Sequence, residues 1–407
     1  AEACIDRFRF QIPGGQLMNC IFLSPHFPYH FHRFCKELRQ AGARALGIGD
    51  AHYDALPAEV REALSEYYRV ERMDDYAELL RACGYFTHRY GKIDRIDSLN
   101  EYWLETEARL RDDFNVVGIR GADIATIRRK SVMKEKFLEA GVAVAAGRVA
   151  GSLAEAEALI AETGFPVVAK PDAGVGALDT FRLDSPADLT GFFAVKPADD
   201  YIIEAFVEGT IHSFDGICDR QGKPIFTTAH VYSQGIMETV NESRHISYHS
   251  LREIPAALEA AGLACLEAFK VRERFFHFEF FRTGPESYTA LEVNMRPPGG
   301  FTTDMFNYAC DFDIYRIWAE LLVQGKNQVD FQRRYHCCYT SRKTGLPYLH
   351  SHAEVLARCG DSLCQVDQVP GVFSSALGDI GYIFRTRELD QLRETVDFIH
   401  RTHPKET

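Results

Sequence analysis

The chain has 407 residues, of which 46% are apolar and 26% charged, and this composition indicates a folded globular protein and excludes a disordered one. Its length exceeds what one hydrophobic core usually supports, so two or three domains are expected. The net charge of −12 comes without a block of basic residues, and no apolar run approaches the ~20 residues that cross a bilayer. Nucleic acid and membranes are therefore not expected as partners.

Residues 1–16 lack the apolar core of a signal peptide and are expected to form a short extension before the first domain. The sequence contains 11 cysteines, an odd number, and they are scattered through apolar contexts. Such a pattern is typical of reduced thiols in a cytoplasmic protein, the expected location. None of them has the CxxC spacing of a zinc site, so structural cysteines are favoured over metal ligands or nucleophiles.

The beginning of the chain predicts an open parallel sheet, because a strand at 17–23 is followed by a helix at 29–40 and a strand at 43–48. The loop after the first strand of such a sheet lies at the edge where ligands bind. Ser24 and His26 in that loop are candidates for substrate contact, and a turn with a surface histidine is an equally weighted alternative. Further helices are predicted at 57–68, 74–82 and 100–112, with a strand at 84–89.

The middle of the chain places one lysine on an apolar strand and a glycine loop directly after it. The strand is 167–171, VVAKP, and a buried lysine such as Lys170 needs an anionic partner. The loop 172–177, DAGVGA, carries Gly174 and Gly176, and glycines let backbone N–H groups approach phosphates closely. Its spacing fits neither the triphosphatase loop nor the dinucleotide fingerprint, so the loop alone is weak evidence.

The other elements of this half follow from periodicity and turn residues. Predicted helices lie at 130–140, 153–161, 255–270, 302–324 and 388–402, predicted strands at 180–183 and 201–207, an extended segment at 142–149 and a hairpin at 211–218 and 223–230. Ser152 is a good N-cap for the second of these helices, and Thr302 or Thr303 is expected to cap the fourth. Short strands and turns are expected from residue 327.

A second hairpin carries the strongest chemical signal. Residues 275–281 and 288–293 predict two strands joined by the turn TGPES, and Glu279 and Glu292 interrupt their apolar pattern. Buried carboxylates are costly unless they are paired or bound to a metal. Two acids on neighbouring strands, with the amide of Asn294 two residues on, suit Mg²⁺, which takes phosphate oxygens as further ligands.

Arg296 lies two residues after Asn294, and its planar guanidinium group would place positive charge and paired N–H donors beside those phosphates. The backbone N–H groups near Gly299 and Gly300 could hold an anionic group, although a tight bend explains these glycines as well. The alternative for the whole hairpin is that its acids face solvent or pair with Arg282 and Arg296.

Taken in order, these motifs resemble those of the ATP-grasp superfamily over residues 115–325, and within it those of carboxylate–amine ligases and biotin carboxylase-like proteins. The resemblance implies an α/β fold whose ATP-grasp part is α+β. A Rossmann-like domain at 17–114 would precede an ATP-grasp domain of two α+β subdomains at 115–326, with a small lid subdomain at about 142–203. A small β-rich C-terminal layer at 327–407 would complete the ATP-grasp region.

The resemblance also implies ATP and Mg²⁺ as cofactors, with Mn²⁺ as a substitute, and it assigns nucleotide contacts. Lys130 stands where the superfamily's first nucleotide-binding lysine opens a helix, and Lys170 where a strand lysine contacts the phosphates and the adenine side. Gly174 and Gly176 match the loop that folds over the triphosphate. Glu204 matches the hinge acid at the adenine amine.

Further contacts implied by the resemblance surround the adenosine. The backbone of Ala205 and Val207 would bind adenine. Glu208 and His212 are the two polar candidates for the ribose, and the sequence leaves the choice between them open.

In the same comparison, Glu279 and Glu292 match the magnesium carboxylates and Asn294 the accompanying amide ligand. Arg296 matches the arginine that stabilises the transferred phosphoryl group, and Lys170 shares that catalytic role. The loop DAGVGA is less glycine-rich than in many relatives, and no AMKM-type biotinylation motif is present.

The expected reaction is ATP-dependent activation of a carboxylate as an acyl phosphate, followed by attack of an amine and release of ADP and phosphate. The alternatives are a biotin carboxylase-like or carbamoyl-phosphate-type activation of bicarbonate, and a non-catalytic nucleotide-binding regulatory protein. Small-molecule acids and amines are the expected partners, and a homodimer is left open. The polar segment 237–242 with Arg244, or Arg272 and Arg274, could bind a substrate, but solvated surface charges explain them equally well.

Overall fold

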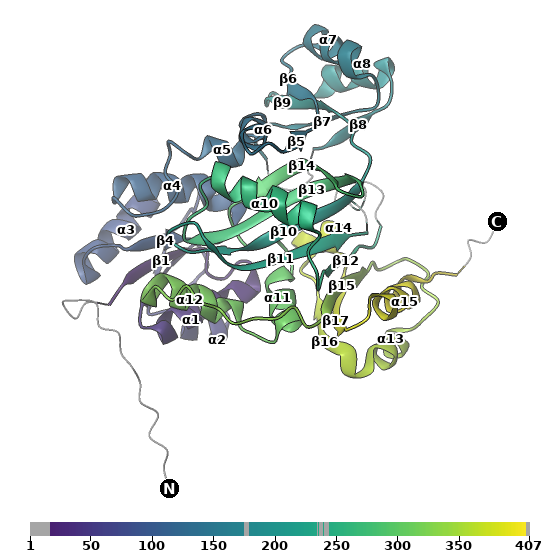
Figure 1. Cartoon of the computed structure of the whole chain (residues 1–407). Helices are drawn as coiled ribbons and strands as arrows, with labels where there is room; N and C mark the ends of the chain where they lie inside the picture. The colour runs from purple at the N-terminus through teal and green to yellow at the C-terminus, as the bar shows by residue number, and fades with distance from the viewer. Residues whose placement is uncertain (1–16, 175–178, 234, 236–238, 240–243, 404–407) are drawn as a thin grey trace. The chain divides into compact units, whose positions relative to one another are not determined.

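The computed structural model describes residues 17–174, 179–233, 235, 239 and 244–403 (Figure 1). The fold is α/β, as predicted. Three of the sequence predictions, for the extension 1–16, for Gly176 and for most of the segment 237–242, concern positions outside the described residues.

The described residues form two compact units. The first comprises residues 17–124 and Ile314–Gln328, and the second comprises Ala125–Asp313 and residues 329–403. The predicted domain boundaries at 114/115 and 326/327 stay predictions, and the end of the predicted helix 302–324 groups with the N-terminal unit. No helix of the described part of the chain combines the length and apolar character needed to cross a membrane.

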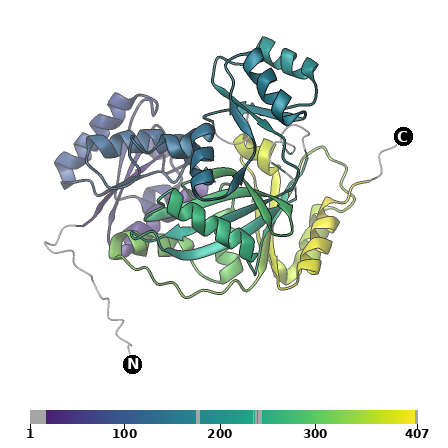
Figure 2. The same cartoon turned by 45° about the horizontal axis from the view of Figure 1, so that its top comes forward.

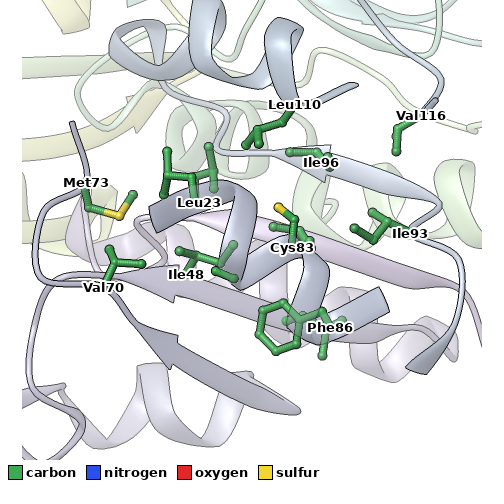
Figure 3. Packing of buried hydrophobic residues seen from close by; sticks show 14 residues of the cluster. Leu23, Ile48, Val70, Met73, Cys83, Phe86, Ile93, Ile96, Leu110 and Val116 are labelled. Carbon is green, nitrogen blue, oxygen red and sulfur yellow. The ribbon is translucent and has the colours of Figure 1, made fainter. Parts of the chain in front are cut away.

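The first unit contains a parallel sheet with the strand order β3-β2-β1-β4, which matches the predicted β-loop-α-β start. Its elements are β1 (Asn19–Leu23), η1 (Tyr29–Phe31), α1 (His32–Ala41), β2 (Arg44–Gly49), η2 (Tyr53–Ala55), α2 (Ala58–Ala63), β3 (Glu66–Arg69), α3 (Tyr76–Tyr90), β4 (Arg95–Asp97), η3 (Glu101–Trp103), α4 (Leu104–Asp113) and α12 (Ile314–Gln324). Strand residues such as Leu23, Ile48 and Ile96 pack against Cys83 and Phe86 of α3 (Figure 3).

Two predictions in this unit are wrong. In both cases the packing of side chains in the folded unit overrides the secondary structure that the local sequence favours. The predicted strand at 84–89 is the second half of helix α3, because Leu79, Ala82, Cys83 and Phe86 bury one helical face and Gly84 costs a helix only about 1 kcal/mol. The predicted helix at 57–68 ends at Ala63, after which β3 pairs in parallel with β2.

The second unit begins with a helical segment and a small antiparallel sheet, ordered β6-β9-β7-β8. Most of this sheet lies within residues 142–203, for which the role of a lid subdomain stays a prediction. These elements are α5 (Ala125–Arg128), α6 (Lys130–Glu139), β5 (Ala143–Val144), β6 (Gly147–Val149), α7 (Leu153–Thr163), β7 (Val167–Pro171), β8 (Phe181–Leu183), α8 (Pro186–Val195) and β9 (Tyr201–Ala205). Ser152 caps α7 as predicted, because its side chain accepts a hydrogen bond from the Glu155 N–H.

Helices α7 and α8 lie together on one face of this small sheet, over the inward side chains of β7 and β9 (Figure 2). Those inward residues are Val167, Ala169 and Ile203. Because successive side chains of a strand point to opposite faces, Lys170 and Glu204 project from the face that α7 and α8 leave uncovered.

The centre of the second unit is a nine-stranded sheet with the order β16-β17-β15-β12-β11-β10-β13-β14-β5. Its remaining elements are β10 (Thr210–Cys218), β11 (Pro224–Tyr232), β12 (Ser247–Ser250), α10 (Ala256–Ala268), β13 (Arg274–Gly284), β14 (Ser287–Asn294), α11 (Thr302–Cys310), β15 (His336–Arg342), α13 (His352–Cys359), η4 (Gly360–Ser362), β16 (Leu363–Gln368), α14 (Gly371–Leu377), β17 (Ile380–Thr386) and α15 (Leu389–His400). Helices α13 and α15 pack on β15 and β17 (Figure 1).

One face of the central strands is aromatic. Phe276, Phe278 and Phe280 of β13 alternate with polar residues, and Phe278 contacts Phe137 of α6 and Phe269 beside α10. The intervening residues of β13 therefore share the opposite face, and both predicted hairpins of this sheet are confirmed.

The predicted helix 302–324 is wrong as one element, because it is broken between α11 and α12. Asp311 ends α11 in the left-handed conformation at φ 53°, which aspartate tolerates better than most residues. The predicted threonine caps are wrong too. Phe301 precedes the helix, and Thr302 uses its hydroxyl to donate to the Gly299 carbonyl at 2.8 Å.

Candidate active site

The two predicted metal carboxylates lie side by side on the central sheet. Glu279 of β13 stands directly opposite Glu292 of β14, and His277 stands opposite Asn294 in the same antiparallel ladder. Because these four residues alternate with Phe278 and Val293, they share one face of the sheet. The side chain of Glu279 is 21% exposed and Glu292 is half-buried, so the acids are neither fully solvated nor sealed in the core.

This donor set fits Mg²⁺. Two carboxylates and one amide oxygen are hard ligands, and Mg²⁺ commonly uses one or two carboxylates and completes its shell with water and phosphate oxygens. No group of three or more His, Cys, Asp or Glu side chains that could hold a metal occurs among the described residues. The two carboxylates and the amide on this sheet face suit an ion that shares its ligands with a nucleotide.

A buried charge network adjoins the two glutamates. Asp215 of β10 faces His277 across the ladder, with 2.5 Å between Asp215 Oδ1 and His277 Nδ1. His277 Nε2 lies 3.0 Å from Glu279 Oε1. Burial alone would lower the pKa of His277, but Asp215 and Glu279 outweigh it and raise this pKa to about 10. Burial would raise the pKa of Asp215, yet His277 and His230 lower it to about 2.

The strand lysine sits in a second cluster, on the uncovered face of the small sheet. Lys170 Nζ lies 2.5 Å from Glu204 Oε1, and Lys134 Nζ of α6 lies 2.8 Å from Glu204 Oε2. Burial would raise the pKa of Glu204, but Lys170 and Lys134 lower it to about 2, so this acid is ionised at neutral pH. Two cations around one anion leave a net positive charge, which favours a further anion such as phosphate.

A glycine makes this cluster sterically feasible. Gly147 of β6 pairs with Glu204 in the ladder, and a Cβ added at Gly147 would come within 2.5 Å of the Glu204 Cβ. Any side chain at position 147 would therefore push against the strand that carries Glu204.

Lys130 opens helix α6, as predicted, and is buried. Among the described residues, no carboxylate lies within ion-pair distance of its ammonium group. The helix start is held by Asp172, whose carboxylate accepts hydrogen bonds from the Ser131 N–H at 2.7 Å and the Ser131 hydroxyl at 3.0 Å. Asp172 thus fixes Lys130 beside the beginning of the glycine loop.

The other predicted nucleotide contacts follow β9. Ala205 already donates its N–H to the Ala146 carbonyl at 2.8 Å, so that N–H is not available to adenine. Val207 is half-buried and Glu208 is exposed in the segment between β9 and β10. His212 is buried, and burial lowers its pKa. The roles of Glu208 and His212 at the ribose stay predictions.

Arg296 and the glycines after it lie beyond β14. Arg296 donates to the Pro297 carbonyl at 2.9 Å. Gly300 has a positive φ of 63°, which a glycine adopts without strain, and a Cβ added there would lie 3.1 Å from the Tyr248 hydroxyl. Gly174 is half-buried at the start of the glycine loop, and the predicted role of that loop as a lid stays a prediction.

The candidate substrate residues occur in both units. In the first unit, His26 Nε2 lies 3.8 Å from Asp50 Oδ1 at the carboxyl edge of the parallel sheet, beside Ser24. Arg244 and Arg272 are exposed, whereas Arg274 is buried. Their roles in substrate binding stay predictions.

Known proteins of the same architecture share this arrangement of elements. A crystal structure of an L-amino acid ligase from Bacillus licheniformis superposes with a TM-score of 0.72 at 12% identity, covering 94% of this chain and 96% of that one. N5-carboxyaminoimidazole synthetase from Staphylococcus aureus, complexed with ADP, gives a TM-score of 0.67 at 13% identity over 93% and 96% of the two chains. The chain has the ATP-grasp fold.

Other ATP-grasp proteins are similar as well. The biotin carboxylase domain of 2-oxoglutarate carboxylase from Hydrogenobacter thermophilus, in complex with MgADP, ADP and bicarbonate, has a TM-score of 0.67 at 15% identity and covers 93% of this chain and 90% of that one. Among curated proteins, an L-arginine-specific L-amino acid ligase from Bacillus subtilis is 24% identical over 249 residues, which span 56% of this chain and 59% of that protein. No model of a known protein family matches the chain.

Four polar residues of the ATP-grasp unit were missed by the sequence reasoning, and each had a usable signal. Lys134 follows Lys130 by one helical turn, so both lie on one side of α6. Asp215 interrupts the apolar strand 211–218, as Glu279 interrupts its own, and His277 precedes Glu279 by two residues on the same face. Asp172 directly follows the strand that carries Lys170.

Proposed function

We propose that this chain is an ATP-dependent, ADP-forming ligase that activates a carboxylate as an acyl phosphate and joins it to an amine. The observation that carries the proposal is the pairing of Glu279 with Glu292, with Asn294 on the same face, within an ATP-grasp fold. The positive cluster around Glu204 supports it, because a nucleotide needs both a metal for its phosphates and cations that neutralise the remaining charge.

In the proposed reaction, a carboxylate oxygen attacks the γ-phosphorus of ATP, the bond to the β–γ bridging oxygen breaks and ADP leaves. The amine nitrogen then attacks the acyl carbon, phosphate departs and the amine loses a proton. When bound by Glu279, Glu292 and Asn294, Mg²⁺ would neutralise phosphate charge during the transfer. Lys170 and Arg296 would stabilise the negative charge that builds on the transferred group.

Lys170 is suited to this role because its partner can be exchanged. Glu204 also holds Lys134, so the carboxylate stays compensated when Lys170 turns toward a phosphate. Lys130 would supply a further cation, because it is buried without a carboxylate partner among the described residues.

L-Amino acids are the substrates we propose to test first. Two of the proteins similar to this chain are L-amino acid ligases by name, one at the level of sequence and one at the level of fold. Cytoplasmic location belongs to the same proposal, since the described cysteines are free thiols and all but Cys364 are buried.

The experiment that tests the proposal is a screen of L-amino acids, singly and in pairs, with ATP and Mg²⁺. We expect phosphate release that requires two amino acids, yields ADP, and gives a product whose mass equals the two substrates minus water. A reaction without Mg²⁺ and with a chelator is the control and should release no phosphate.

Other outcomes of the screen contradict the ligase proposal in different ways. Phosphate release with bicarbonate alone would indicate bicarbonate activation. Formation of AMP and pyrophosphate would exclude an acyl phosphate, and tight ATP binding without turnover for any acid would indicate a regulatory nucleotide-binding protein.

A further inference from the structure

Glu279 of β13 is the outer member of a chain of three side chains in contact. Asp215 contacts His277, and His277 in turn contacts Glu279, at the distances given above. The carboxylate of Asp215 is completely buried and also contacts the Ser213 hydroxyl at 2.6 Å and His230 Nδ1 at 2.7 Å. Three donors around two oxygens make Asp215 a fixed anchor at the inner end of the chain.

The contacts of His277 indicate which of its ring nitrogens donate hydrogen bonds. Both ring nitrogens face carboxylate oxygens, and an ionised carboxylate only accepts hydrogen bonds. Each nitrogen must therefore donate, so the ring is an imidazolium with its two N–H bonds directed at Asp215 and Glu279. This ring is fixed in orientation, because turning it would break both contacts at once.

His230 is the other histidine on Asp215, and its environment is different. Its Nδ1 faces Asp215, while its Nε2 is buried without a hydrogen-bond partner among the described residues, close to the ring of Phe306. His230 thus contacts Asp215 through one ring nitrogen. It therefore helps to hold Asp215, and it makes no contact that leads on to Glu279.

The contact from His277 falls on Glu279, a carboxylate that faces another carboxylate. Glu279 stands directly opposite Glu292, and like charges at opposed positions of a ladder repel each other. His277 lies on the same face, and its Nε2 contacts Oε1 of Glu279. The other oxygen, Oε2, accepts no hydrogen bond from the described residues and stays available to a cation.

We propose that the buried Asp215–His277 pair positions Glu279 for the divalent cation by fixing one of its carboxylate oxygens. Asp215 and His277 are positioning residues, since neither is expected to touch the ion or the nucleotide. This inference rests on the proposed function only in that it takes Glu279 as a metal ligand, and its test needs no knowledge of the substrates.

The test is the affinity for Mn²⁺ in the presence of ADP, followed by electron paramagnetic resonance of the free ion, for the wild type and Asp215→Asn. An asparagine oxygen accepts the hydrogen bond of His277 Nδ1 less strongly than a carboxylate oxygen does, so the ring is held less firmly and Glu279 loses its oriented donor. We expect Mn²⁺ to bind about tenfold to a hundredfold more weakly, the usual effect of removing a residue that orients a metal ligand. The affinity for ADP without metal should change less than about twofold, well under the 1.4 kcal/mol of a tenfold change.

Asp219→Asn is the matched control, because Asp219 is also buried and lies just beyond β10, where it accepts hydrogen bonds from the N–H groups of Gln221 and Lys223 at 2.9 Å. This variant should lose thermal stability but keep the wild-type affinity for Mn²⁺. Equal weakening of Mn²⁺ binding in both variants would mean that any buried aspartate acts through stability alone, and would overturn the inference.

A double-mutant cycle with His277→Gln gives a second, independent test. Because Asp215 is proposed to act only through His277, Asp215→Asn should have little further effect on Mn²⁺ affinity once His277 is replaced. If the two effects add fully, the inference fails. His336→Gln, on β15 with its ring nitrogen on the Ser250 carbonyl at 3.0 Å, is the histidine control and should bind Mn²⁺ normally. Should Asp215→Asn not fold, the comparison of His277→Gln with His336→Gln decides.

The result also separates this inference from the proposed function. Unchanged Mn²⁺ affinity in Asp215→Asn refutes the positioning role and leaves the ligase proposal intact. A wild-type protein that binds no Mn²⁺ with ADP refutes the metal assignment and the positioning role together. A wild type that binds Mn²⁺, with weakened binding in the variants but no ligation of any amine, supports the positioning role while the ligase proposal fails.

Discussion

Replacing Glu292 with glutamine is expected to lower ATP-dependent phosphate release by more than about a hundredfold, equivalent to ~2.7 kcal/mol of transition-state stabilisation. The substitution keeps the size of the side chain and removes one negative charge from the pair that Glu292 forms with Glu279. A divalent cation then has a single protein carboxylate, so it is held less firmly and neutralises less phosphate charge. Initial rates at saturating ATP and Mg²⁺ measure the effect.

The control for this variant lies on the same hairpin. Glu286 is exposed in the turn between β13 and β14, and Glu286→Gln makes the same chemical change away from the sheet face. It should retain the wild-type rate. A Glu292→Gln enzyme that also keeps a near-normal rate would remove Glu292 from the metal site.

Lys170→Ala is expected to raise the concentration of Mg-ATP needed for half-maximal turnover tenfold or more, or ~1.4 kcal/mol for one lost charge-assisted contact. The structure adds a reason to expect the folded protein to survive the change. Glu204 keeps its contact with Lys134 at 2.8 Å, so no buried carboxylate is left without a cation. Steady-state kinetics with varied Mg-ATP, together with a thermal unfolding curve, test both statements.

Lys136→Ala serves as the comparison, because Lys136 lies on the same helix as Lys134 and pairs with Glu139 at 2.6 Å near the surface. Surface ion pairs contribute little to the free energy of unfolding, so this variant should have the Mg-ATP requirement and the thermal unfolding curve of the wild type. An unchanged Mg-ATP requirement in Lys170→Ala would place that lysine outside the nucleotide site.

The elements that carry the chemistry were predictable because their patterns are local. The carboxylate hairpin has alternating aromatic residues and a turn, and the predicted strands lie within β13 and β14. The registers that place Glu279 opposite Glu292 follow from a connection too short to allow many alternatives. Lys130 and Lys170 were found for the same reason, since each marks a helix start or a buried strand.

Other features depend on partners far away in the sequence, and for these local patterns were insufficient. Asp215 meets His277 across strands that lie 62 residues apart in sequence, so only the pairing of β10 with β13 brings them together. The aromatic residues around Phe86 look like a strand, but their burial against the parallel sheet favours helix α3. The break at Asp311 depends on a backbone conformation that composition does not reveal.

The most direct test of the account is to locate the metal itself, by anomalous scattering of Mn²⁺ in crystals of the full chain grown with ADP. We expect a manganese ion bound between the carboxylates of Glu279 and Glu292, with phosphate oxygens of ADP completing its ligands. A manganese ion bound elsewhere, with these two side chains turned apart into solvent, would contradict the central claim.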